Sequence, residues 1–294
     1  MDANAPRKRI KELEVMVADC IRETADTVTL LLFTGNDRLD YQAGHFLTID
    51  PHQFPELERF IDYFEEVKGK KEPPRAYSMS SAPHERFLAI TVKEERYASG
   101  ATRYPPLLSP LLVKGMTRGM RLAITGFTGP YVLPSKLEDR AQHLVHVCAG
   151  SGIVPNFSIL KQSLADHPAL RHTLVYCNRT WSDVIFAREL SELQQRHPDR
   201  LRVVHTLTRE TADRLKGPHG EARAGRIGAA LLREVVADPS ACVAFACGPG
   251  ITSHDKAEAR RTGVAAAPRF LETTLAALRE IGLTEEQLEY ESYG

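Results

Sequence analysis

The sequence predicts two domains of different class, an antiparallel β-domain followed by a parallel α/β domain. The chain of 294 residues is long for one hydrophobic core and suits two domains of about 100–200 residues each. Its first part consists of short, often alternating apolar runs separated by Gly, Asn, Asp and Pro, which is typical of an antiparallel sandwich or small barrel. After about residue 140, apolar runs alternate with helical patterns, as in βαβ units with a parallel sheet.

The β-domain is expected to cover residues 1–138. Two segments interrupt its strands, and both have helical character. In 54–74 the apolar residues fall at helical spacing and a basic loop ending in proline follows, so we expect a helical insertion there. In 100–115 paired prolines indicate a turn before a short helix. The expected strands, in chain order, are 13–24, 26–35, 45–50, 75–83, 87–95 and 119–129.

The α/β domain is expected to cover residues 139–294. Its strands read as continuous rather than alternating apolar runs, which indicates that helices cover both faces of the sheet. The expected strands are 143–150, 171–178, 201–208 and 242–250, and the expected helices are 152–167, 184–196, 228–238 and 269–282.

Composition and spacing exclude several classes of protein. The formal net charge is zero, which gives no sign of a nucleic-acid binder, and there is no apolar run long enough for a membrane span. The N-terminal residues lack the apolar core of a signal peptide, so we expect a cytoplasmic protein with reduced thiols. The five cysteines and eleven histidines form no spacing typical of an iron–sulfur cluster or of a metal site.

Two glycine-containing turns follow strands of the predicted parallel sheet. AGSGIVPN, residues 149–156, leads into a helix whose N-terminus could hold a phosphate. ACGPG, residues 246–250, ends the last expected core strand. Ligands of open α/β sheets bind beyond the carboxyl ends of the strands, so both turns should border one crevice. The alternatives are a plain tight turn for the first and a buried cysteine for Cys247.

The stretch RAYSMSSAP, residues 75–83, puts an arginine, a tyrosine and several hydroxyls on one expected strand. Together the R-x-Y-S, G-S-G-I-x-P and C-G-P motifs, in this order and in this β-then-α/β pattern, resemble the ferredoxin–NADP reductase superfamily. That resemblance covers nearly the whole chain. It implies an antiparallel flavin-binding β-barrel followed by a Rossmann-like, nicotinamide-binding α/β domain.

The resemblance assigns flavin contacts to the first domain. Arg75 would pair with the flavin pyrophosphate, Tyr77 would pack along the flavin, and Ser78 would lie near flavin N5. The alternatives are a surface salt bridge for Arg75 and a half-buried strand aromatic for Tyr77. The complete set of residues implied to contact the flavin is Arg75, Ala76, Tyr77, Ser78, Val92, Lys93, Gly100, Ala101 and Thr102.

The resemblance also assigns nicotinamide contacts to the second domain. Thr208 and Arg209 resemble a Ser-Arg pair that holds the 2′-phosphate of NADPH, and with Asn178 and Arg179 they favour NADPH over NADH. The alternative is that both arginines are solvated or pair with Asp183 and Glu210. The remaining residues implied to contact the nucleotide are Gly150, Ser151, Gly152, Pro155, Cys247, Gly248 and Pro249.

The ending EYESYG carries an acid and an aromatic, Glu291 and Tyr293, where members of the superfamily often have an acid and a ring that covers the flavin. The alternative is a frayed tail. The catalytic residues implied by the resemblance are therefore Ser78, Cys247, Glu291 and Tyr293.

The resemblance implies an oxidoreductase that moves electrons from NADPH or NADH through FAD, which is favoured over FMN, to a separate carrier. This carrier would be a ferredoxin or an oxygenase iron–sulfur component. The alternatives are a flavin or ferric reductase and a regulatory flavin-binding subunit without turnover. Two basic clusters could dock an acidic carrier or be solvated loops: Lys68, Lys70 and Lys71, and Lys256, Arg260 and Arg261.

Overall fold

The chain divides into two compact units, Met1–Val132 and Leu133–Gly294. The structure is a computed structural model that describes all residues except 1–11, 36–38, 98–103, 218 and 294. The observed division precedes the expected boundary between residues 138 and 139 by a few residues, because the segment Leu133–Ala141, which holds the short helix α3 (Leu137–Arg140), belongs to the second unit.

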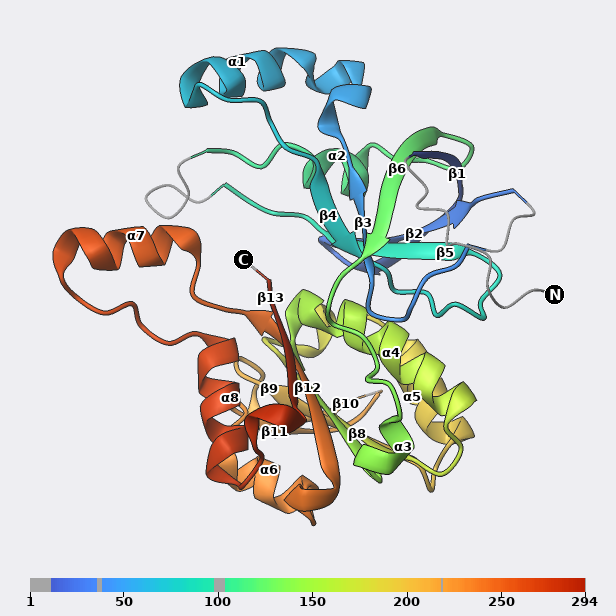
Figure 1. Ribbon diagram of the computed structural model, residues 1–294, viewed down its shortest axis with the longest axis vertical. Coiled ribbons are helices and arrows are strands. Elements are labelled where there is room, and N and C mark those ends of the chain that lie inside the picture. Colours follow the sequence, from blue (N-terminus) through green and yellow to red (C-terminus); the bar gives the residue numbers. More distant parts are fainter. Residues whose placement is uncertain (1–11, 36–38, 98–103, 218, 294) are drawn as a thin grey trace. The chain divides into compact units, whose positions relative to one another are not determined.

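The first unit is built on a six-stranded antiparallel sheet in the order β4-β3-β6-β1-β2-β5 (Figure 1). The sheet curls until its two edge strands, β4 and β5, meet at one isolated bridge between Met79 and Ile90. The expected barrel is thus present as a curved sheet that no continuous ladder closes. The strands are β1 (Leu13–Thr24), β2 (Thr27–Phe33), β3 (Phe46–Ile49), β4 (Arg75–Ser78), β5 (Leu88–Lys93) and β6 (Arg121–Thr128).

Two helices accompany this sheet, α1 (Glu58–Lys68) and α2 (Ser109–Lys114). The expected helical insertion is α1, which follows two short 3₁₀ turns, η1 (Pro51–Gln53) and η2 (Pro55–Leu57). Ile61 and Phe64 turn its apolar face into the core, and Gly69 ends it with φ 65°, a left-handed conformation that glycine adopts without a steric cost. The opposite side of α1 leaves Phe60, Tyr63 and Val67 exposed.

The second unit is a seven-stranded sheet in the order β10-β11-β9-β8-β7-β12-β13, parallel except for the β10–β11 pair. The strands are β7 (His143–Ala149), β8 (Arg171–Asn178), β9 (Leu201–Leu207), β10 (Lys216–Gly217), β11 (Gly220–Ala224), β12 (Cys242–Pro249) and β13 (Leu288–Tyr293). The expected strands correspond to β7, β8, β9 and β12. The three short strands at the two edges were not expected.

Helices cover both faces of this sheet, which explains why its central strands carry continuous apolar runs. One core lies between the sheet and α4 (Ile153–Asp166) and α5 (Ala187–Arg196), and the other between the sheet and α6 (Ala229–Val235) and α8 (Phe270–Glu280). The helix α7 (Ser253–Thr262) differs because it buries none of its residues. Figure 1 shows it standing apart from α8.

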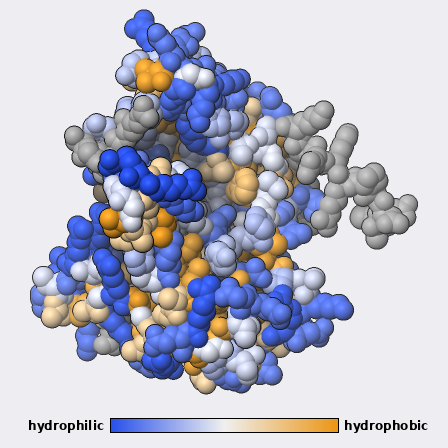
Figure 2. All heavy atoms as spheres, turned by 60° about the vertical axis from the view of Figure 1, so that its left-hand side comes forward, coloured by the Kyte–Doolittle hydropathy of each residue, from blue (hydrophilic) through white to orange (hydrophobic). Residues whose placement is uncertain are grey.

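Within the described ranges, no helix has the length and the apolar character needed to span a bilayer. On the face in Figure 2, hydrophilic residues predominate and hydrophobic residues lie scattered among them.

Histidine, cysteine and carboxylate side chains of the described chain form no cluster that could hold a metal ion.

Candidate functional site

Arg75, the first residue of β4, is held by an ion pair. Its Nη2 donates a hydrogen bond of 2.6 Å to Oε2 of Glu72, and its Nη1 donates one of 2.6 Å to the carbonyl of Pro73. The Arg75 side chain is 35% exposed, whereas that of Glu72 is 2% exposed. The predicted alternative, a salt bridge, is therefore present. It joins Arg75 to a buried rather than a surface carboxylate, and the role of Arg75 in binding a ligand stays a prediction.

A chain of charged groups extends from Glu72 into α1. Glu72 also accepts from Lys68 Nζ, and its own N–H donates to Glu65 Oε1 at 2.8 Å. Burial alone would raise the Glu72 pKa, but the bonds from Lys68 and Arg75 outweigh it and lower the pKa. Glu65 is bonded to His52 Nε2 at 2.8 Å, and the bonds to Asp50 and Glu65 raise the His52 pKa.

The other residues expected to contact the flavin lie where the two edge strands part. If the antiparallel pairing continued from the Met79–Ile90 bridge, Tyr77 would face Val92, but β4 and β5 form no ladder. The outward edges of both strands therefore leave backbone groups without a neighbouring strand. Arg75, Ala76, Tyr77 and Ser78 lie on β4, and Val92 and Lys93 end β5.

The side chains on these strands differ in burial. Ser78 and Val92 are buried, and the partly buried Tyr77 packs against the core, where burial raises its pKa. Lys93 binds Asp26 through a 2.8 Å ion pair, and its contact with a ligand stays a prediction. Gly100, Ala101 and Thr102 lie outside the described residues.

The two glycine turns of the second unit touch each other. The turn after β7 is a short 3₁₀ helix, η3 (Gly150–Gly152), and a Cβ added to Gly152 would lie 2.2 Å from the carbonyl oxygen of Cys247. Tyr176 donates to the carbonyl of Gly150 at 2.9 Å and fixes the turn from below. The two motifs thus meet at one edge of the sheet, and the ligand-binding crevice that they should border stays a prediction. Tight packing is a sufficient reason for Gly152, so its contact with a ligand stays a prediction.

Buried Cys247 and partly buried Glu291 lie beside each other at the ends of neighbouring strands. The register between β12 and β13 places Cys247 opposite Glu291, and Cys247 is fully buried. Burial raises the pKa of the Cys247 thiol, with the Glu291 charge as a second cause, and burial raises the Glu291 pKa to about 7. Oε2 of Glu291 has no hydrogen-bond partner among the described residues. Such an orphaned carboxyl is costly in the ionised form.

Tyr293 is the last residue of β13 and lies opposite Pro249. The alternative of a frayed tail is wrong for Leu288–Tyr293, because this segment adds a parallel strand to the sheet. Of the other expected contacts, Gly248 packs so closely that a Cβ would meet the Phe270 ring at 2.5 Å. Ser151 belongs to η3, and Pro155 is buried in the first turn of α4.

Asn178, Arg179, Thr208 and Arg209 lie together at the carboxyl ends of β8 and β9. Backbone bonds of 3.0 Å from Thr208 to Asn178 and of 2.8 Å from Arg209 to Arg179 join the two chain segments. Both arginines are exposed, and neither forms an ion pair with a described residue. The Nδ2 of Asn178 is buried without a partner in the described chain. These four residues thus share one edge with the glycine turns.

Of the two alternatives for these arginines, the described residues show exposure to solvent and no pairing with Asp183 or Glu210. Asp183 accepts from the backbone and hydroxyl of Thr180, as part of a capping box. Glu210 accepts from the Trp181 backbone at 3.1 Å and pairs with Arg214.

Both predicted basic clusters are smaller than expected. Lys68 is bound to buried Glu72 and lies over the Phe64 and Tyr104 rings, at 4.6 and 4.7 Å from their centroids. Arg261 pairs with Glu258 on the same helix. Docking by these clusters stays a hypothesis.

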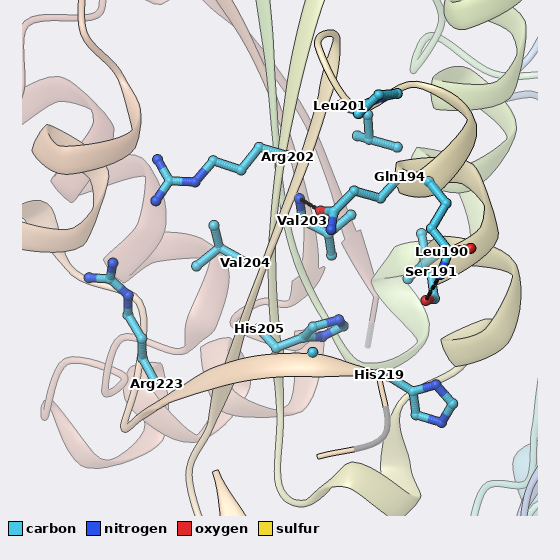
Figure 3. A pocket seen from close by; sticks show the side chains of 13 residues that line it. Leu190, Ser191, Gln194, Leu201, Arg202, Val203, Val204, His205, His219 and Arg223 are labelled. Atoms are coloured by element: carbon cyan, nitrogen blue, oxygen red, sulfur yellow. Dashed lines mark hydrogen bonds between the residues drawn. The ribbon is translucent and has the colours of Figure 1, made fainter. Parts of the chain in front are cut away.

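A groove of about 960 Å³ opens beside the first half of β9 (Figure 3). It lies where β11, which pairs only with His205–Leu207, leaves residues 201–204 paired with β8 alone. Oε1 of Gln194, from α5, accepts from the Val203 N–H at 2.6 Å. Figure 3 shows Arg202 and Arg223 extending away from α5, and both pair with Glu234. None of the residues expected to bind a cofactor lines this groove.

Glu72 is the residue near the expected contacts that sequence reasoning missed. An acid three positions before an arginine, across two prolines, is a visible signal in KEPPR. Its burial, however, depends on how the segment after α1 returns to the sheet.

The antiparallel sheet followed by a parallel sheet with two meeting glycine turns defines a two-domain protein of the nucleotide-binding reductase type. A family model described as the oxidoreductase NAD-binding domain matches residues 146–253. The chain is 35% identical to the ferredoxin reductase component of 3-ketosteroid-9-alpha-monooxygenase from Mycolicibacterium smegmatis, over 81% of this chain and 58% of that protein. The chain therefore spans little more than half the length of this curated relative.

Solved structures show the same fold. The FAD/NAD binding domain of nitric oxide dioxygenase from Vibrio cholerae superposes with a TM-score of 0.70 at 21% identity, over 98% of this chain and 100% of that one. Ferredoxin-NADP+ reductase from Plasmodium falciparum superposes with a TM-score of 0.67 at 15% identity, over 96% of both chains. The chain thus has the two-domain fold of ferredoxin–NADP reductase and its structural neighbours, and its second unit matches the oxidoreductase NAD-binding domain family.

Proposed function

We propose that the protein is an NAD(P)H-dependent flavoprotein reductase that binds FAD in its first unit and passes electrons to a separate one-electron carrier. The observation that carries this proposal is the parting of β4 and β5 beyond the Met79–Ile90 bridge. Arg75 and Tyr77 lie on one of the parting strands and Val92 and Lys93 on the other. Unpaired backbone groups, an arginine and an aromatic side chain together suit a ligand with a phosphate and a flat ring.

The residues of β4 fit a dinucleotide flavin. A guanidinium has five N–H donors, and two of those on Arg75 are used by Glu72 and Pro73, so three remain for phosphate oxygens. Bound FAD would supply the chemistry that converts a two-electron hydride donor into single electrons. Ser78 and Tyr77 would orient its ring.

The second unit fits a nicotinamide dinucleotide at the carboxyl edge of its sheet. The turn Gly150–Gly152 presents backbone groups to a pyrophosphate, while Arg179 and Arg209 provide two exposed guanidiniums for a 2′-phosphate. The unpaired Nδ2 of Asn178 adds a donor. These features favour NADPH over NADH.

Cys247 and Glu291 carry little negative charge at this edge. The raised pKa of the thiol keeps Cys247 protonated, and a pKa of about 7 leaves Glu291 partly protonated at neutral pH. An edge of reduced negative charge suits a nicotinamide ring, and Oε2 of Glu291 can hold a proton without a competing partner among the described residues. Tyr293 would shield the ring edge from water.

The electron acceptor is proposed to be a ferredoxin or the iron–sulfur component of an oxygenase. Support comes from the relatives, since the mycobacterial one is named as the ferredoxin reductase component of a monooxygenase. A free flavin or ferric reductase would instead oxidise NADPH rapidly without any protein acceptor.

The test is the absorbance spectrum of the purified protein with identification of the released flavin, followed by the Arg75→Ala variant. We expect FAD, and about a 100-fold loss of FAD affinity in the variant, since charge-assisted bonds to phosphate are the strong ones. Arg121→Ala is the matched control because Arg121 pairs with Glu14 at the surface, where its side chain is 66% exposed. A colourless protein that binds no added flavin would contradict the proposal.

A further inference from the structure

Glu72 stands at the centre of a buried ion triad with Lys68 and Arg75. Its side chain is 2% exposed, that of Lys68 is 18% exposed and that of Arg75 is 35% exposed. One carboxylate therefore serves two cations that differ in their access to solvent. The most exposed member is the arginine.

The carboxylate fixes one side of the Arg75 guanidinium. Nη2 is bonded to Glu72 and Nη1 to the Pro73 carbonyl, both at 2.6 Å. The planar guanidinium cannot turn about its own axis while both bonds hold. The remaining donors thereby keep one direction.

Glu72 is itself fixed by the segment that contains α1. Its backbone N–H is bonded to Glu65, its carboxylate to Lys68, and Lys68 in turn lies over two aromatic rings. The inserted segment 54–74 thus ends in an anchored acid directly before the strand that begins at Arg75. A freely solvated arginine would lose more rotamer entropy on meeting a phosphate.

We propose that Glu72 is a positioning residue for Arg75, which presets the guanidinium for the phosphate of the bound flavin. This inference rests on the proposed function of Arg75. It assigns the inserted segment a role in cofactor binding.

Electrostatics alone predicts the opposite effect, so the sign of the effect distinguishes the two. A negative charge next to an anion site weakens the binding of the anion. Removing the charge in Glu72→Gln would therefore tighten FAD binding if Glu72 acted only as a charge. If Glu72 positions Arg75, the same substitution weakens binding.

The experiment is a fluorescence titration of the full-length apoprotein with FAD at two salt concentrations, with circular dichroism as a check on folding. We expect Glu72→Gln to bind FAD about 10-fold more weakly. Glu14→Gln is the matched control, because it makes the same chemical change at an exposed carboxylate that pairs with Arg121 and not with Arg75. We expect Glu14→Gln to stay within about threefold of the wild type.

A double-mutant cycle separates positioning from a general loss of structure. In an Arg75→Lys background, Glu72→Gln should cause no further loss of FAD affinity, since lysine has no fork to orient. Glu72→Asp should recover part of the affinity, and it replaces Glu72→Gln in the cycle if the amide variant does not fold.

Three results would overturn the inference: unchanged or tighter FAD binding by Glu72→Gln, an equal loss in the Arg75→Lys background, or a loss in Glu14→Gln as large as that in Glu72→Gln. Normal FAD affinity of Arg75→Ala would overturn the proposed role of Arg75 together with this inference. A loss in Arg75→Ala with normal binding by Glu72→Gln would overturn this inference alone.

Discussion

The two regions expected to hold nucleotide phosphates are built on different physical grounds. At the start of β4, charged side chains link Asp50, His52, Glu65, Glu72 and Arg75 into one network. At the ends of β7 and β12, the region consists of closely packed backbone and of groups whose pKa is raised by burial. The first region should therefore respond to charge and pH, and the second chiefly to added volume.

The largest effect is expected for Gly152→Ala. The added methyl group would lie 2.2 Å from the Cys247 carbonyl oxygen. Because this atom belongs to the backbone, one of the two segments would have to move, and we expect a loss of about 3 kcal/mol in the free energy of unfolding. Urea denaturation followed by the fluorescence of Trp181, the one tryptophan of the chain, reports on the second unit.

Gly150→Ala is the control for that experiment. Gly150 has φ 54° but nothing within 4 Å of an added Cβ, so only left-handed strain of about 1–2 kcal/mol is expected. Equal losses of stability in the two variants would show that close packing against Cys247 is not what requires glycine at position 152.

The next largest effect is expected for Glu72→Ala in the first unit. Removal of the carboxylate leaves Lys68 and Arg75 without their counter-ion, and because both cations reach solvent we expect about 2 kcal/mol rather than the full cost of a buried pair. Far-UV circular dichroism measures the loss. The control is Glu14→Ala, at an exposed pair with Arg121, which should cost under about 0.5 kcal/mol. A similar cost for Glu72→Ala would mean that burial of the Glu72 carboxylate does not increase the contribution of its ion pairs to stability.

Glu291 should make the second unit less stable as the pH rises. Its pKa is about 7 in the folded protein and near the ordinary glutamate value of about 4.3 when unfolded. The folded state therefore binds the proton more tightly, so this contribution to stability is complete below about pH 4 and is lost as the pH rises through 7.

We expect the wild type to lose on the order of 1 kcal/mol between pH 5.5 and 8 through this group, measured as the shift of the thermal midpoint. Glu291→Gln should flatten the profile. A profile identical to that of the wild type would show that the Glu291 pKa is not raised in the folded protein.

The smallest effect is expected from His52. Its pKa is raised by Asp50 and then by Glu65, so its stabilising contribution is present below about pH 6.5 and fades as the pH rises through the raised folded value. The side chain is 28% exposed, and we expect less than about 1 kcal/mol. Repeating the pH series on His52→Gln at low and high salt would detect it. A salt-independent difference would contradict an electrostatic origin.

Sequence reasoning could predict the edge where Gly152 and Cys247 meet, because parallel strands present their carboxyl ends on one side of a sheet. It could also place Arg75 on a strand. It could not predict that buried Glu72 binds Lys68, because the sequence of a basic segment does not show which of its lysines pairs with a buried carboxylate. The strand that carries Glu291 depends on a crossover through α8, so the burial of its carboxyl follows from tertiary structure alone.

The hydrogen bond between Gln194 and Val203 has a consequence for how molecules behave in crowded solution. The first half of β9 pairs with β8 on one side and has no paired strand on the other, and such an open edge invites a strand from another molecule to pair with it. The Gln194 amide occupies an N–H that such a strand would need. We therefore expect this side chain to disfavour pairing between copies of the protein, besides bonding α5 to the sheet.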